Sequence, residues 1–77
     1  MQINNKNIIK ILEKTLDGKL PQIDKLLDDG VLDSLAMVMV IEELENTFSI
    51  EISPTDFTHL NFNSVKSISE MLERIIV

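Results

Sequence analysis

The chain has 77 residues, of which 44% are hydrophobic, and a formal net charge of −6. This length predicts one domain, close to the lower limit for a self-supporting core. With no cysteine and a single histidine, the sequence excludes disulfides, thiol nucleophiles and most histidine-based catalytic or metal sites. The acidic balance argues against binding to nucleic acid or to anionic membranes and favours basic protein partners.

Nothing in the sequence indicates a targeting or membrane-spanning segment. Residues 1–6 are polar, and the longest apolar run, residues 35–41, is far shorter than a membrane span. We therefore expect a cytoplasmic protein without membrane insertion. So small a chain also has little room for an enclosed substrate pocket, and we do not expect it to be an enzyme on its own.

Residues 5–17 have the period of an amphipathic helix, with apolar residues recurring every four positions from Ile8. Asn4 or Asn5 can cap its start. Gly18 follows the periodic stretch and is predicted to take the left-handed conformation that ends many helices.

Residues 18–33 form a long connection that contains Pro21 and Gly30. Connections of this length in a compact domain are usually functional or contain an ordered turn. We expect this one to pack on the helices, because it carries five large apolar residues: Leu20, Ile23, Leu26, Leu27 and Leu32.

Residues 34–49 are predicted to form the second helix, with Asp33 or Ser34 as its cap. Spacings of three and four select one core-facing stripe: Leu35, Val38, Ile41, Leu44 and Phe48. The remaining apolar residues of the helix would then lie partly outside the core: Ala36, Met37, Met39 and Val40.

Two further helices complete the chain. Ser53 and Pro54 form a helix-start signal and predict a short helix over residues 54–59. Ser64 is the expected cap of a last helix over residues 64–76. Three long helices, one short helix, a long first loop and no credible strand pair indicate an all-α four-helix bundle in a single domain over 1–77.

Ser34 is the most informative residue for function. A hydroxyl at a helix N-terminus lies where free backbone N–H groups and the helix dipole favour a phosphate. The alternative is that Asp33 or Ser34 only caps the helix, which is the more frequent explanation for such residues taken singly. Both explanations stay open at this point.

Acidic residues flank this position on both sides. Each carboxylate alone is best explained as part of a solvated surface. Together with an apolar helix that one buried stripe cannot accommodate, they predict a docking surface for a basic enzyme. The acidic residues are Asp28, Asp29 and Asp33 before the helix and Glu42, Glu43 and Glu45 within it.

Other kinds of site find little support. A calcium loop around Asp28 and Gly30 would need an oxygen ligand where Lys25 stands. His59 has no cysteine or activated serine near it in the sequence, and we expect it to be an ordinary loop residue.

Residues 29–35 read Asp-Gly-Val-Leu-Asp-Ser-Leu and are followed by apolar and acidic positions as far as Phe48. In this region the chain resembles the phosphopantetheine attachment region of the acyl carrier protein family. Residues 50–54 resemble its turn after the second helix, and residues 62–68 resemble the start of its last helix. The resemblance covers essentially the whole chain.

The resemblance implies a carrier that binds no metal of its own. A separate Mg²⁺-dependent phosphopantetheinyl transferase would attach 4′-phosphopantetheine from coenzyme A to Ser34. The arm would hold an acyl or aminoacyl group as a thioester, loaded by a ligase or acyltransferase and delivered to downstream enzymes. We expect a monomer with these partner-binding residues: Asp33, Leu35, Ala36, Met39, Glu42, Glu43 and Glu45.

With Leu32 before Asp33, and with Ala36 and Met39 in the helix, the chain departs from carriers of general fatty-acid synthesis. It is more similar to discrete carriers with a dedicated ligase, such as D-alanyl carriers, or to carriers of specialised pathways. Whether the cargo is acyl or aminoacyl stays open. The alternative function is that of an unmodified acidic helical module that binds proteins through the second helix.

Overall fold

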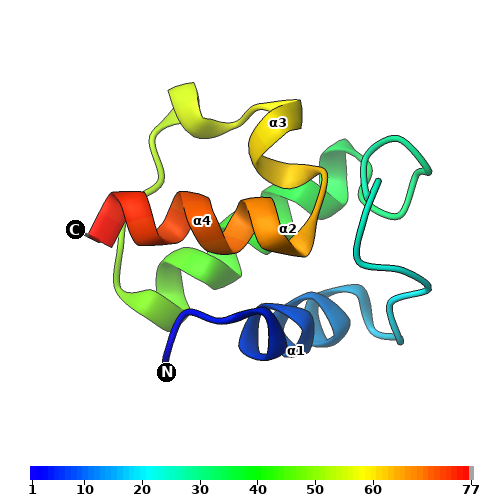
Figure 1. Cartoon of the computed structure of the whole chain (residues 1–77), viewed down its shortest axis with the longest axis horizontal. Coiled ribbons are helices and arrows are strands. Elements are labelled where there is room, and N and C mark those ends of the chain that lie inside the picture. The colour runs from blue at the N-terminus through cyan, green and yellow to red at the C-terminus, as the bar shows by residue number, and fades with distance from the viewer. Residues whose placement is uncertain (77) are drawn as a thin grey trace.

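The computed structural model describes residues 1–76. Over this range the regular structure consists of helices, and there is no strand (Figure 1). The all-α four-helix fold of acyl-carrier type is therefore confirmed. The elements are α1 (Asn5–Leu16), α2 (Ser34–Phe48), the 3₁₀ turn η1 (Pro54–Asp56), α3 (His59–Phe62) and α4 (Val65–Ile76).

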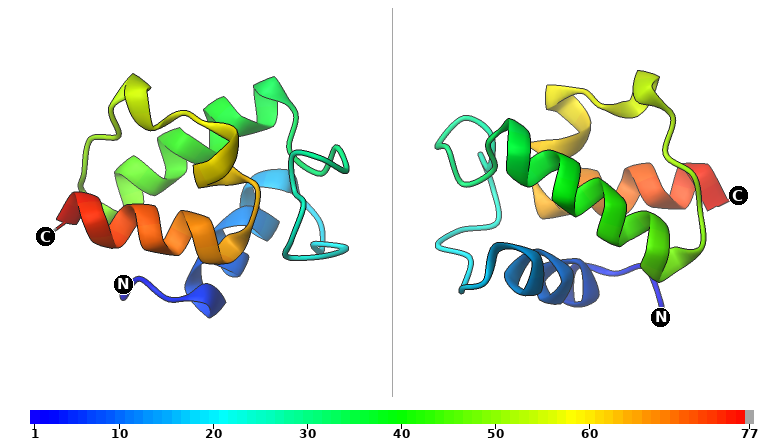
Figure 2. Two further views of the ribbon diagram at one scale, coloured as in Figure 1. Left: turned by 45° about the horizontal axis from the view of Figure 1, so that its top comes forward. Right: turned by 180° about the vertical axis from the view of Figure 1, so that it is seen from behind.

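One apolar core holds the three long helices together. α1 packs against both α2 and α4, and α3 packs against α4, as the two views of Figure 2 show. Burial of apolar surface supplies the main stabilising free energy, at about 25 cal/mol per Å². The core contains Ile8, Ile11 and Leu12 of α1, Val40, Ile41 and Leu44 of α2, and Val65, Ile68, Met71 and Leu72 of α4, with Leu26, Leu32, Ile52 and Phe62 from the shorter segments.

The structure confirms three of the predicted helix starts. The Asn4 side chain accepts a hydrogen bond from the N–H group of Asn7 at 2.8 Å. Ser53 caps η1, and the Ser64 hydroxyl accepts a bond from Ser67 N at 3.0 Å. Each side chain satisfies an N–H group that the helix itself leaves unpaired.

The end of α1 differs from the prediction, because Asp17 and not Gly18 has the left-handed conformation, with φ 56°. The helix stops at Leu16, and the N–H groups of Asp17 and Gly18 both turn back to carbonyls of its last turn. Asp is one of the few residues besides Gly that adopt this conformation readily. Ser49 ends α2 in the same way, with φ 54°.

The predicted core stripe of α2 is wrong in its first half. Leu35 is 70% exposed and Val38 is 61% exposed, whereas Val40 is completely buried. The buried face runs through Val40, Ile41 and Leu44, with Met37 packed partly against it. An unbroken apolar run is compatible with several rotations of the helix, so its spacing alone could not select the buried face.

The predicted short helix over residues 54–59 is two separate elements. η1 ends at Asp56, and the Thr58 hydroxyl then accepts a bond from Asn61 N at 3.2 Å and caps α3. A threonine that bonds to the backbone favours a new helix start over continuation of the preceding turn. His59 is therefore the first residue of α3 and not a loop residue.

The long connection between α1 and α2 is packed, as the sequence predicts. Leu26 and Leu32 are buried, and Leu32 N donates to the Leu26 carbonyl at 2.9 Å. Val65 N, at the start of α4, donates to the Ile23 carbonyl at 2.9 Å. These bonds fix the connection at the end of the bundle where α2 begins (Figures 1 and 2).

Candidate phosphopantetheine attachment site

Asp33 and Ser34 have distinct roles at the start of α2. The Asp33 backbone is extended, and its carboxylate Oδ1 accepts a hydrogen bond from Ala36 N at 2.8 Å. Asp33 is therefore the N-cap, and Ser34 is the exposed first residue of the helix. The sequence left open whether Asp33 or Ser34 caps the helix, and the structure shows that Asp33 makes the cap and Ser34 does not.

The connection holds this helix start in place from the N-terminal side. Gly30 has φ 74°, a conformation that favours glycine, and turns the chain back toward the bundle. Leu32 is buried two residues before Ser34 and fixes the backbone there. The Ser34 side chain is thus presented to solvent from a well-anchored backbone.

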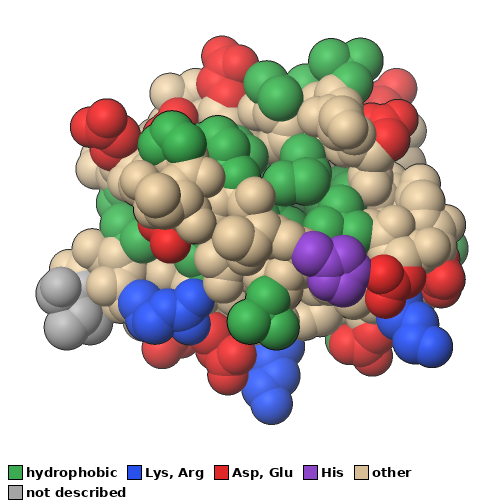
Figure 3. All heavy atoms as spheres, turned by 90° about the horizontal axis from the view of Figure 1, so that it is seen from above, with side chains coloured by type: hydrophobic (Ala, Val, Ile, Leu, Met, Phe, Trp, Pro, Cys, Tyr) green, Lys and Arg blue, Asp and Glu red, His purple; other side chains and the backbone are tan. Residues whose placement is uncertain are grey.

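Several large apolar side chains are exposed on α2 and on the η1–α3 segment, among them Leu35, Val38, Phe57 and Leu60. Figure 3 shows apolar side chains gathered on this face, with carboxylates around its edge. Leu60 is the most exposed of them, at 79%. Exposed apolar groups of this kind are typical of protein-binding surfaces.

A cluster of polar side chains joins the connection to α3. His59 Nε2 lies 2.6 Å from Asp28 Oδ1, and Asn63 Nδ2 donates to Asp28 Oδ2 at 3.1 Å. The hydrogen bonds from His59 and Asn63 lower the pKa of the Asp28 carboxyl below its ordinary value. Sequence reasoning missed this cluster, because nothing local to Asp28 indicates partners more than 30 residues away.

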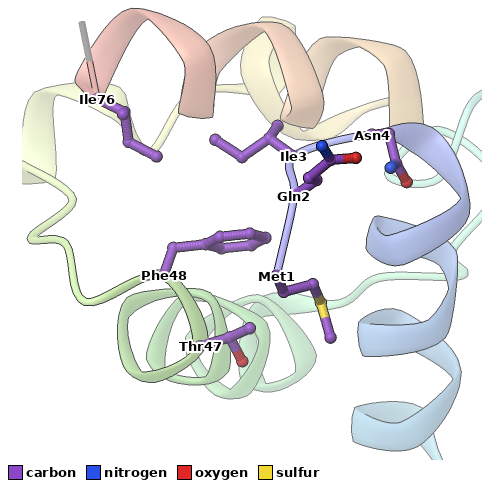
Figure 4. A pocket seen from close by; sticks show the side chains of 7 residues that line it. All are labelled: Met1, Gln2, Ile3, Asn4, Thr47, Phe48 and Ile76. Carbon is purple, nitrogen blue, oxygen red and sulfur yellow. The ribbon is translucent and has the colours of Figure 1, made fainter.

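The largest cavity described, about 580 Å³, lies far from Ser34. Its lining includes Thr47 and Phe48 at the other end of α2, and a helix of 15 residues is roughly 22 Å long. In Figure 4 the Phe48 ring and the Ile3 and Ile76 side chains extend into this space. The cavity is therefore separate from the serine.

A profile of the protein family described as "phosphopantetheine attachment site" matches residues 8–72. This match covers most of the chain, including all of α2 and the cluster beside it. The chain belongs to the phosphopantetheine-attachment family. The predicted family membership is thus confirmed, and the cofactor of this carrier domain is covalently attached 4′-phosphopantetheine.

The carrier domain is similar to D-alanyl carrier proteins of Streptococcus pyogenes. Those of serotype M5 (strain Manfredo), serotype M49 (strain NZ131) and serotype M1 are each 40% identical to it over 52 residues. The matched region is 68% of this chain and 66% of each relative's length.

The residues at the start of α2 fit this cofactor. An exposed hydroxyl is free for esterification, and the helix N-terminus favours the negative charge of the resulting phosphodiester.

No group of three or more His, Cys, Asp or Glu side chains that could hold a metal ion occurs within residues 1–76. None of the helices over the same residues has the length and apolar character that a membrane span requires.

The predicted partner-binding residues of α2 lie in different environments. Leu35, Met39 and Glu42 are exposed, in positions where a partner could contact them. Ala36 is half-buried and packs against the core. Partner binding by Asp33 and by these residues stays a prediction.

Two of the predicted acidic residues also contact the rest of the carrier domain. Glu43 pairs with Lys14 of α1, with 3.2 Å between Oε1 and Nζ. Glu45 Oε2 accepts a hydrogen bond from Ile52 N at 2.8 Å and so holds the turn after α2. Their partner-binding role also stays a prediction, but both side chains already form bonds within the carrier domain.

Proposed function

We propose that this chain is a carrier protein that holds an acyl or aminoacyl group as a thioester on a 4′-phosphopantetheine arm attached to Ser34 Oγ. The observation that carries the proposal is the division of roles at the start of α2. Asp33 makes the cap, and Ser34 therefore has an exposed hydroxyl in the region that matches the family. Within residues 1–76, no other serine is at once exposed, inside the matched region and the first residue of a long helix.

The arm supplies a flexible tether that ends in a thiol, a group that this cysteine-free chain lacks. The task of the chain is to present that tether from a fixed point. The anchored backbone around Leu32 and the cap at Asp33 hold the attachment point, while its exposure leaves the tether free to reach different enzymes. Tethering raises the effective concentration of the cargo at each docked partner.

The charge of the molecule supports docking to basic partners. The net charge is −6, and exposed carboxylates lie just before α2, at Asp29 and Asp33, and in the middle of the helix, at Glu42. A phosphopantetheinyl transferase, a loading ligase or acyltransferase and the downstream enzymes must each bind and leave in turn. A small interface with an apolar centre and a charged edge suits such transient binding. We further propose that the carrier itself catalyses no step and that it works in the cytoplasm.

We propose D-alanine as the cargo to test first. The relatives described above are D-alanyl carrier proteins, and an aminoacyl group would be loaded by an adenylating ligase. The comparison to make is between loading of the modified protein with D-alanine and with fatty acids, each with its own ligase. Fatty-acyl loading alone would exclude an aminoacyl carrier without affecting the attachment at Ser34.

Intact-mass measurement tests the carrier function. The protein is incubated with coenzyme A, Mg²⁺ and a broad-specificity phosphopantetheinyl transferase, and we expect the mass of one phosphopantetheine to be added. Ser34→Ala should gain nothing, whereas the control Ser53→Ala, which removes another exposed serine, should gain as much as the wild type. An unmodified wild type would refute the carrier function and favour the unmodified interaction module.

A further inference from the structure

Asn63 forms the centre of the contact between the connection and the α3–α4 junction. Its Oδ1 accepts hydrogen bonds from Leu27 N at 2.9 Å and Asp28 N at 3.1 Å. Its backbone carbonyl accepts a third from Leu26 N at 2.8 Å. A single residue thus holds three consecutive N–H groups of the connection.

Asp28 extends this contact to α3. One of its carboxylate oxygens accepts from Asn63 Nδ2 at 3.1 Å, and the other lies 2.6 Å from His59 Nε2. Both oxygens are therefore engaged, each by a different residue. Because the partners come from the first turn of α3 and from the residue after its end, the carboxylate fixes α3 to the connection at two points.

Asn63 is linked to Ser34 through Leu26 and Leu32. Leu26, held by Asn63, accepts a hydrogen bond from Leu32 N at 2.9 Å, and both leucines are buried. Leu32 is followed by the cap at Asp33 and then by Ser34. In the first turn of α2, Ala36 and Met37 pack only partly against the core, and the fully buried residues begin at Val40, so the connection contributes to the position of this turn.

We propose that Asn63 and Asp28, with His59, are positioning residues that fix Ser34 relative to α3 for recognition by the phosphopantetheinyl transferase. This inference rests on the proposed function and names residues that would allow the transferase to recognise the site. A partner that contacts Leu35 of α2 and Leu60 of α3 at the same time requires these two side chains to keep a fixed position relative to each other. The cluster is the set of side-chain hydrogen bonds that ties the connection before Ser34 to α3.

Replacement of Asn63 tests the proposal, with Asn61 as a matched control. Asn61 lies in α3, donates to the Asp56 carbonyl at 2.9 Å and accepts from Arg74 at 3.0 Å, but makes no bond with the connection among those described. We expect Asn63→Ala to raise the transferase KM for the carrier about tenfold, the scale of one or two hydrogen bonds, with kcat changed by less than about twofold. Asn61→Ala should leave both constants near the wild-type values.

An exchange of roles separates positioning from a merely structural effect. In Asn63→Asp alone, two carboxylates face each other, and KM should rise further. In the double variant Asp28→Asn with Asn63→Asp, the carboxylate at position 63 still accepts both N–H bonds, and the amide at position 28 donates to it. We expect the double variant to regain a KM within about threefold of the wild type.

The outcomes distinguish this inference from the proposed function. If the wild type is not modified at all, the proposed function fails and the inference fails with it. If the wild type is modified and folded Asn63→Ala has an unchanged KM, only the positioning role fails. A folded double variant whose KM stays as high as that of Asn63→Asp would also overturn it. Amide exchange of Leu27 and Asp28, faster in Asn63→Ala, reports on the cluster without the transferase.

Discussion

Asp33 and Ser34 are neighbours in the chain, but a substitution at each should affect a different property. The Asp33 carboxylate stabilises the start of α2 by accepting a hydrogen bond from Ala36 N and carries a charge next to the proposed attachment point at Ser34. The Ser34 hydroxyl is exposed and is not needed for the cap. Stability, recognition and attachment can therefore be measured separately within two adjacent residues.

Substitutions of Asp33 should separate its cap from its charge. Asp33→Ala removes both and should lower the free energy of unfolding by about 1 kcal/mol. Asp33→Asn keeps a capping oxygen and should unfold at nearly the wild-type urea concentration. Both variants should raise the transferase KM, because both lose the charge. A wild-type urea midpoint for Asp33→Ala would show that the cap contributes nothing.

Asp28 should make stability depend on pH at the acid end. Its pKa is lowered in the folded protein, chiefly by the hydrogen bond from His59 and then by that from Asn63. Its stabilising effect is fully present above the ordinary carboxyl value of 3.8 and is lost as the pH falls through the lower folded-state pKa.

The wild type should therefore lose stability more steeply than Asp28→Asn as the pH falls below about 4. Urea unfolding at a series of pH values between about 7 and 3 measures the two curves. Parallel curves at the acid end would contradict a contribution from the ionised carboxylate.

Among the helices, the rotation of α2 about its axis decides which apolar side chains are buried and which are exposed beside Ser34. Its apolar residues divide into a buried set around Leu44 and an exposed set around Leu35. The exposed set follows directly after Ser34 in the chain. The apolar run therefore contributes both to the core and to the surface next to the proposed attachment point.

A pair of leucine substitutions in α2 tests this division. Leu44→Ala empties a fully buried position and should lower the free energy of unfolding by about 2–5 kcal/mol. Leu35→Ala should change it by less than about 0.5 kcal/mol, because the side chain is largely exposed. Chemical denaturation measures both, and equal losses would mean that Leu35 is part of the core.

The buried face of α2 could not be predicted from the sequence, whereas that of α4 could. In α4, polar residues separate the apolar ones, and the buried Val65, Ile68 and Leu72 follow the period expected of that helix. In α2, residues 35–41 are all apolar, and several rotations satisfy the period equally well. Packing against α1, which the local sequence does not encode, contributes to selecting the rotation.

The polar cluster shows a second limit. Ser34 and its surroundings could be predicted because the signal is contiguous in the sequence. Asn63 and Asp28 are 35 residues apart, and each has an ordinary local explanation as a polar residue in a loop. Only the folded chain brings them together, so a functional role for the pair becomes visible at the level of the structure.

For the whole molecule, the acidic charge should control how fast partners bind. With a net charge of −6, attraction to a basic transferase is screened as salt increases. We expect the transferase KM for the carrier to rise several-fold between about 50 and 500 mM NaCl, with kcat changing much less. An unchanged KM would indicate that the apolar contacts around Leu35 dominate recognition.

The most direct test of the central claim is to locate the modification in the chain. Protein treated with coenzyme A, Mg²⁺ and the transferase is digested, and the peptides are fragmented in a mass spectrometer. We predict one phosphopantetheine per chain, on Ser34. Its presence on another residue, or its absence from a folded wild-type protein that was incubated with an active transferase, would contradict the account.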